Sequence, residues 1–211
     1  MDTANKGQVK NGDVLKEARS GDFILCRKTL PLVKLFFQFL TDHKKAIIKG
    51  SDIGLTLIDM VKRKRNLDAL KINLKKELRD LSDKLKKSGI LDVKEHSGYT
   101  AFEDKVMVLL FIAEMSSDMF ELKRKIRQIF TDKIEGIVLS TVHKIKGLEA
   151  DRVFIIRPDI LPMKVKKSWE YQQEKNLEYV AITRAKNTLI YDYDWNDEDV
   201  SLSDLKKDLL L

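Results

Sequence analysis

"STVHKIKGLEADRVFII", residues 140–156, is the stretch that decides the fold. It follows one short apolar run, residues 137–139, and ends in another, residues 153–156. Both runs predict buried β-strands. Between the runs the chain carries polar residues and one glycine, namely His143, Lys146, Gly147 and Glu149. Polar loops on the ends of buried strands are where α/β proteins keep their functional residues, so this turn is a candidate site. The alternative is a solvated connection that merely happens to be charged.

The composition predicts a soluble globular protein. Of the 211 residues, 43% are hydrophobic and 35% charged, while 3 prolines and 9 glycines leave little room for disordered linkers. The single cysteine, Cys26, lies in the apolar run 23–26 and has no partner for an internal disulfide. We therefore expect a buried thiol and a reducing, intracellular setting.

No segment predicts export or a membrane span. Residues 1–13 are polar and lack the apolar stretch of a signal peptide. The longest apolar run, residues 106–113, has 8 residues, far fewer than the roughly 18 that a membrane helix needs. The sequence thus predicts a cytoplasmic protein with no membrane partner.

Positive charge is concentrated in one segment. The net charge is +7, and residues 61–88 contain 11 Lys and Arg against 4 acidic residues, which equals the whole excess. A basic helix fits nucleic acid or an anionic surface. A solvated, lysine-rich helix face is the alternative.

Patterning along the chain predicts an α/β fold with an all-helical interruption. A strand at 23–26, a helix from Pro31 and a strand at 47–48 form a β-α-β unit, which implies parallel strands. Strand patterns return at 137–139, 153–156 and 189–191, with a helix at about 169–184 between the last two. We expect a parallel sheet with helices on both faces, formed by residues 1–50 and 132–211.

Residues 51–131 predict the helical insertion. Its first helix shows a leucine stripe that ends before Ser88-Gly89: Leu67, Leu70, Leu74, Leu78, Leu81 and Leu85. Residues 100–103 form a capping box that predicts the start of a second helix, running to Met115. A third helix follows Asp118, with Leu122, Ile126, Ile129 and Phe130 on one face.

One arginine directly follows a predicted strand, and another lies shortly before one. Arg27 comes directly after the strand at 23–26, and Arg184 stands at the end of the helix before the strand at 189–191. A guanidinium held by its surroundings suits phosphate, because its planar fork donates two parallel hydrogen bonds. For Arg184 the alternative is an arginine that caps the carbonyl groups of its own helix.

Three stretches together resemble motifs IV, V and VI of the UvrD/Rep family of superfamily 1 DNA helicases: GDFILCRKTLP (21–31), LSTVHKIKGLEADRVFII (139–156) and LEYVAITRAKNTLIY (177–191). The family patterns T-x-H-x-x-K-G-L-E and Y-V-A-x-T-R-A-K are complete at 141–149 and 179–186. A helical insertion between motifs IV and V is also a family feature. The resemblance implies the second of two RecA-like domains.

The resemblance also implies roles for individual residues. Arg27 and Arg184 match the catalytic arginine fingers that reach the γ-phosphate of ATP; such fingers are worth about 10³–10⁵ in rate. Gly147 and Glu149 match positions beside the γ-phosphate and the ribose. Thr141 and His143 match positions that contact single-stranded DNA. We expect both arginines at one shared edge of the sheet.

The chain departs from the family in what it lacks. It contains no G-x-x-x-x-G-K-[ST] loop to cradle phosphates, and no strand ends in the Asp-Glu pair that would hold Mg²⁺. ATP and Mg²⁺ would therefore need an N-terminal RecA-like domain, on the same polypeptide or on a separate subunit. We expect the isolated chain to be inactive. The alternative function is a non-catalytic module, derived from a helicase domain, that binds nucleic acid or protein.

The insertion departs from the family in size. Family insertions are usually larger and contact duplex DNA, so the basic segment is the candidate for that contact here, with the positive run Lys62, Arg63, Lys64 and Arg65 at its start. A solvated face remains the alternative.

No metal site is predicted. The acidic stretch 192–204 places Asp and Asn like the first ligands of a calcium loop, but it has Asp197 where glycine is required and Ser203 where glutamate is required. His43 and His96 have no Cys or His partner at ligand spacing.

Overall fold

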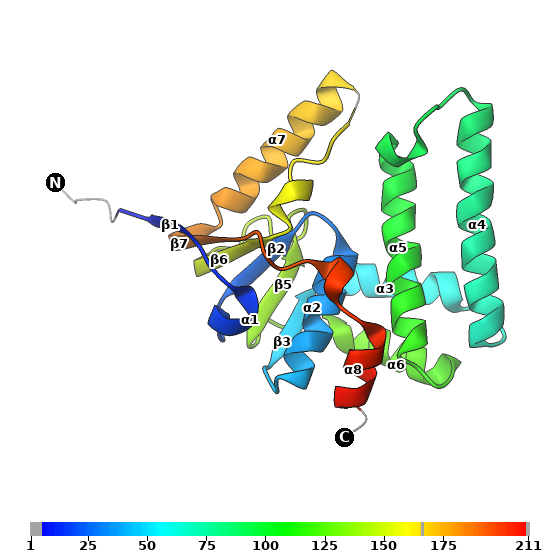
Figure 1. Cartoon of the computed structure of the whole chain (residues 1–211), viewed down its shortest axis with the longest axis horizontal. Coiled ribbons are helices and arrows are strands. Elements are labelled where there is room, and N and C mark those ends of the chain that lie inside the picture. The colour runs from blue at the N-terminus through cyan, green and yellow to red at the C-terminus, as the bar shows by residue number, and fades with distance from the viewer. Residues whose placement is uncertain (1–5, 166, 210–211) are drawn as a thin grey trace.

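The computed structural model describes residues 6–165 and 167–209, and side chains as far as Lys206. Its described part contains one sheet, whose strand order is β1-β7-β6-β2-β5-β3-β4 (Figure 1). Every neighbouring pair is parallel. The strands in sheet order are β1 Gln8–Asn11, β7 Ala185–Asp192, β6 Ala150–Ile156, β2 Phe23–Cys26, β5 Ile137–Thr141, β3 Ala46–Lys49 and β4 Phe130–Thr131. The predicted α/β fold with a parallel sheet is confirmed.

The central strands are buried on both faces. All four residues of β2 and all five of β5 are buried, which explains why their sequences are continuous rather than alternating apolar runs. Cys26 is fully buried, as expected, and burial raises the pKa of its thiol to about 12.

Alternate residues of each strand face two different helical layers. Ile24 and Cys26 pack into a core with α2 (Thr29–Thr41), whereas Phe23 and Leu25 pack into a second core with α7 (Ser168–Ile182). α1 (Val14–Glu17) and α8 (Leu202–Leu209) lie on the α2 side. Figure 1 shows α7 and α2 on opposite sides of the sheet. Helices therefore cover both faces, as predicted.

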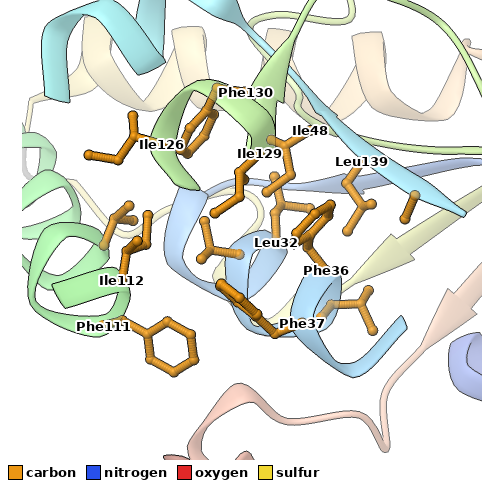
Figure 2. Packing of buried hydrophobic residues seen from close by; sticks show 14 of the residues in the cluster. Leu32, Phe36, Phe37, Ile48, Phe111, Ile112, Ile126, Ile129, Phe130 and Leu139 are labelled. Carbon is orange, nitrogen blue, oxygen red and sulfur yellow. The ribbon is translucent and has the colours of Figure 1, made fainter. Parts of the chain in front are cut away.

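Four helices lie between β3 and β4: α3 (Ser51–Val61), α4 (Leu67–Lys87), α5 (Ser97–Glu114) and α6 (Met119–Ile129). α4 and α5 stand side by side and run in opposite directions (Figure 1). Leu70 and Leu74 of the leucine stripe are fully buried. The core under α2 continues into α5 and α6, as the close contact of Phe37 with Phe111 illustrates (Figure 2).

Three local expectations about these helices are wrong. α5 begins at Ser97, because the His96 imidazole accepts the Tyr99 backbone N–H and supplies the cap; residues 100–103 lie inside the helix. Phe130 does not extend the face of α6. It lies in β4, where it pairs with Ile48 of β3. The segment 61–88 is not one helix, since Lys62 to Asn66 form the connection between α3 and α4.

Several elements were not anticipated from the sequence. β1 is a short edge strand, mostly exposed, that exists through its pairing with β7. α1, α3, β4 and α8 were not predicted either, and β6 begins three residues earlier than its apolar run. Within the described residues, no helix is both long and apolar enough to cross a lipid bilayer.

Candidate functional site

The carboxyl ends of β2 and β5 lie side by side, because Cys26 pairs with Thr141. Arg27 and His143 follow these ends and line a cavity of about 330 Å³, which we call the carboxyl-edge pocket. α3 and α5 supply its far side. Its walls are made by Arg27, Lys28, Thr29, Asp52, Ile53, Thr56, Ser97, Thr100, Ala101, Asp104, Lys105, Thr141, His143, Lys144 and Met163.

Arg27 is held in this pocket by a buried carboxylate. Its Nε and Nη2 donate to the two carboxylate oxygens of Glu174 on α7. Met163 adds a backbone N–H to Glu174 Oε2 at 3.0 Å. Burial pushes the pKa of Glu174 upward, but the Arg27 ion pair and the Met163 N–H outweigh burial and leave the pKa below its usual value.

Thr141 and His143 lie beside this ion pair. Thr141 is the last residue of β5 and is buried, while His143 lies in the turn that follows and lines the pocket. The pKa of His143 is lowered, first by desolvation of its ring and then by the charges of Arg27 and Lys144; Glu174 acts in the opposite direction. A neutral imidazole here can both donate and accept a hydrogen bond.

A second cluster lies at the opposite edge of the sheet. The turn at residues 142–149 carries the chain from the carboxyl end of β5 to the amino end of β6. Arg184 reaches it there, because its Nη1 donates to the Leu148 carbonyl at 3.2 Å. Arg184 thus stands beside Gly147 and Glu149, both of which are exposed. We call Gly147, Glu149 and Arg184 the amino-edge cluster.

Arg184 also serves its own helix. Its Nε donates to the Val180 carbonyl at 3.0 Å, and its Nη2 donates to Thr183 Oγ1 at 3.1 Å. These bonds match the capping role that the sequence left open. With Leu148 they use three of the five N–H groups of the guanidinium, so two remain for an anion.

The expectation that Arg27 and Arg184 share one edge is wrong. Strand register sets them about eight residues, or roughly 25 Å, apart along the sheet. The physical reason is simple: in a parallel sheet, a residue that follows a strand and one that precedes a strand lie at opposite edges. Both guanidinium groups contact α7, at Glu174 and Val180, which are about 9 Å apart along the helix axis.

The run Lys62–Arg65 is not part of either cluster. Lys62 pairs with Asp59 at 2.5 Å and Lys64 with Glu77 at 3.0 Å, both at the far end of α3 from the carboxyl-edge pocket. This position contradicts the expectation that these residues belong to one basic helix.

Sequence reasoning missed Glu174, Asp104 and Lys105. A signal for Glu174 existed, since it shares a helical face with Leu177 and Ala181 at i, i+3 and i+7. A glutamate on an apolar face requires a buried partner, which here is Arg27.

The acidic stretch near the C-terminus has internal partners. Asp192 accepts the backbone N–H groups of Val14 and Trp195 at 2.7 and 2.8 Å. Asp197 pairs with Arg157 and Lys34. These carboxylates tie the C-terminal segment to the sheet and to α2. Among the described residues, no group of three His, Cys, Asp or Glu side chains is arranged to hold a metal ion.

Comparison with known proteins gives consistent matches. The chain is 31% identical over 133 residues to a probable DNA helicase II homolog of Mycoplasma capricolum subsp. capricolum, which covers 58% of this chain and 17% of that protein. It is 34% identical over 96 residues to the ATP-dependent DNA helicase Rep of Buchnera aphidicola subsp. Schizaphis graminum, which covers 44% of this chain and 14% of that protein. The matched part is therefore less than a fifth of either relative's length.

A family model extends these matches. The model described as the UvrD-like helicase C-terminal domain matches residues 62–194. This range contains the turn at 142–149, α7 and Arg184, whereas Arg27 lies outside it. Because the match covers more than half of the chain, the protein belongs to the UvrD-like helicase C-terminal domain family.

Proposed function

We propose that this chain is the second motor domain of an ATP-dependent DNA helicase that translocates on single-stranded DNA, with a place in DNA repair. In this proposal residues 1–50 and 132–211 form the RecA-like motor domain, and residues 51–131 form its helical insertion. The nucleotide contacts the amino-edge cluster, and DNA contacts the carboxyl-edge pocket. The two sites are joined by the turn at 142–149 and by α7, so a change at one can move the other.

The observation that carries the proposal is the contact between Arg184 and Leu148. It places a guanidinium with two free N–H groups between a glycine and an exposed carboxylate. Gly147 has a φ of +86° and open space where a side chain would begin, so a phosphate can approach its backbone. Glu149 can accept hydrogen bonds from ribose hydroxyl groups. Arg184 can stabilise negative charge on the phosphate during transfer.

The carboxyl-edge pocket supports the DNA part of the proposal. Thr141 and His143 present a hydroxyl and an imidazole beside several cationic side chains, and phosphate contacts of this kind supply most sequence-independent affinity. Arg27 lies in this pocket, so we assign it to DNA rather than to ATP.

The phosphate-cradling loop and the Mg²⁺ ligands are proposed to lie on an N-terminal RecA-like domain, in the same polypeptide or in a separate subunit. The Rep relative, which is named as ATP-dependent, is several times longer than the matched segment. When bound, Mg²⁺ and ATP would supply the phosphoryl chemistry. The residues of this chain orient the nucleotide and stabilise its charge.

The test is ATP hydrolysis by this chain joined to such an N-terminal domain. We expect Arg184→Ala to lower kcat by about 10³ or more, and the chain alone to give negligible turnover. Unchanged turnover in the Arg184→Ala complex would leave the alternative, a non-catalytic module that binds nucleic acid or protein. The bond from Arg184 to Val180 is the observation that favours this alternative, because it shows the arginine capping its own helix.

A further inference from the structure

The first half of α5 is fastened directly to the motor sheet. Asp104 accepts the backbone N–H groups of Thr29 and Leu30 at 2.8 and 3.0 Å. These are the first two residues of α2, whose own N-cap residue, Lys28, provides no side-chain cap. A carboxylate from the helical segment therefore caps a helix of the sheet layer and fixes where α5 stands.

This contact brings two lysines of distant segments to the lining of the carboxyl-edge pocket. Lys28 precedes Thr29 on the sheet side, and Lys105 follows Asp104 on the α5 side; both line the pocket. The other cations of the pocket are already paired, since Arg27 binds Glu174 and Lys144 binds Asp52. Asp52 and Asp104 also line the pocket, but among the described residues neither Lys28 nor Lys105 forms an ion pair with a carboxylate.

We propose that Lys28 and Lys105 together clamp one phosphodiester group of single-stranded DNA. The inference rests on the proposed function and assigns new residues to its DNA site. Two lysines that line one cavity and form no ion pair suit a phosphate, which accepts hydrogen bonds from several directions and offsets positive charge. Thr141 and His143, in the same cavity, then contact the adjoining part of the strand.

In this proposal the helical segment contacts DNA through Lys105, and not through the basic residues Lys62–Arg65 that the charge distribution suggested. Lys62–Arg65 follow the C-terminal end of α3. That end is about 15 Å along the helix axis from Ser51, the first residue of α3. Asp52, Ile53 and Thr56, near the start of α3, line the pocket instead. Lys105 therefore makes the contact, although it lies outside the basic segment 61–88.

The test is binding of the chain to a fluorescent oligothymidine, measured by anisotropy across salt concentrations. One lost phosphate contact on a single strand lowers the slope of log K against log salt by about 0.7. Lys105→Ala should therefore weaken binding roughly eightfold at about 50 mM salt and roughly threefold at about 200 mM. Lys28→Ala should behave in the same way, and Lys105→Arg should keep most of the affinity.

Arg127→Ala is the matched control, because it removes one charge at an exposed position of α6 and Arg127 does not line the carboxyl-edge pocket. It should leave the slope unchanged. Thermal melts of all variants separate lost binding from lost folding. The clamp is overturned if Lys105→Ala matches Arg127→Ala, or if Lys62→Ala and Arg63→Ala lower the slope while Lys105→Ala does not.

The two proposals fail in different ways. If Thr141→Val and His143→Ala weaken binding but Lys105→Ala does not, the DNA site stands and the clamp falls. If the unmodified chain does not bind oligothymidine, both fall. Displacement of the oligonucleotide by inorganic phosphate, beyond the effect of sodium chloride at equal ionic strength, would assign the lysines to a small free anion and overturn the clamp.

Discussion

Arg27 and Glu174 hold each other in a two-pronged ion pair, with Nε 2.8 Å from Oε2 and Nη2 2.6 Å from Oε1. The pair joins the carboxyl end of β2 to the buried side of α7, and the Glu174 side chain is only 8% exposed. The same carboxylate receives the Met163 N–H. Glu174 is therefore the point at which a strand end, a loop and a helix are fixed together.

Removal of Glu174 should destabilise the fold. Glu174→Ala leaves the Arg27 guanidinium without its buried partner, which typically costs about 3–5 kcal/mol. Urea unfolding followed by circular dichroism measures the change. Glu178→Ala on the same helix is the control, because its pair with Lys175 is more exposed and should contribute less than about 1 kcal/mol. Equal losses in the two variants would contradict a special role for the buried pair.

Gly147→Ala should separate backbone strain from function. Gly147 and Gly89 have nearly the same φ, +86° and +85°, and both have open space where a side chain would start. Alanine at either position should lower the free energy of unfolding by about 1 kcal/mol, because a residue with a side chain is strained at this positive φ. In the complex with an N-terminal motor domain, only Gly147→Ala should also raise the KM for ATP, because its methyl group would meet the phosphate. Matching KM values in the two variants would remove Gly147 from the nucleotide site.

Stability should fall in acid partly through Glu121. Hydrogen bonds from the backbone and side chain of Ser117, and then from Lys125, hold the pKa of Glu121 at about 2, below its usual 4.5. A depressed pKa stabilises the folded chain above pH 4.5, and this contribution is lost as the pH falls from 4.5 towards 2. Urea unfolding at several pH values measures this. Between pH 4.5 and 2, the free energy of unfolding should fall less steeply with pH in Glu121→Gln than in the unmodified chain. An unchanged slope would show that the carboxylate is not held in this way.

Loss of Asp104 should loosen α5 from the sheet layer. Asp104→Ala leaves two backbone N–H groups at the start of α2 without a cap, which costs about 1 kcal/mol. Hydrogen exchange should show faster opening at the start of α2. Asp118→Ala, which removes a cap that α6 supplies for itself, should cost a similar amount but leave α2 protected. Loss of protection in α2 with both variants would contradict the cross-element cap.

Patterns that act locally were readable from the sequence. Continuous apolar runs located β2 and β5, because strands covered on both faces are apolar throughout. The leucine stripe located α4, and Asp118 located the start of α6. The motifs at 141–149 and 179–186 brought Gly147, Glu149 and Arg184 to one place, because the turn before β6 and the residue before β7 lie at the same edge of a parallel sheet.

Contacts between distant segments were not readable in this way. β1 is polar and short, and only its pairing with β7 makes it a strand. Lys28 and Lys105 are 77 residues apart in sequence; Lys28 lies in the motif at 21–31, whereas Lys105 has no motif signal. Their shared pocket depends on the Asp104 contact, which no spacing rule predicts.

The sequence by itself determined the parallel α/β sheet, the helices that interrupt it and the family to which the chain belongs, because periodicity and short motifs are properties of neighbouring residues. The tertiary structure alone decided that Arg27 and Arg184 lie at opposite edges of the sheet, and that Arg27 is paired with Glu174. Strand direction and register set which ends meet, and both arise from pairing and burial across the whole chain.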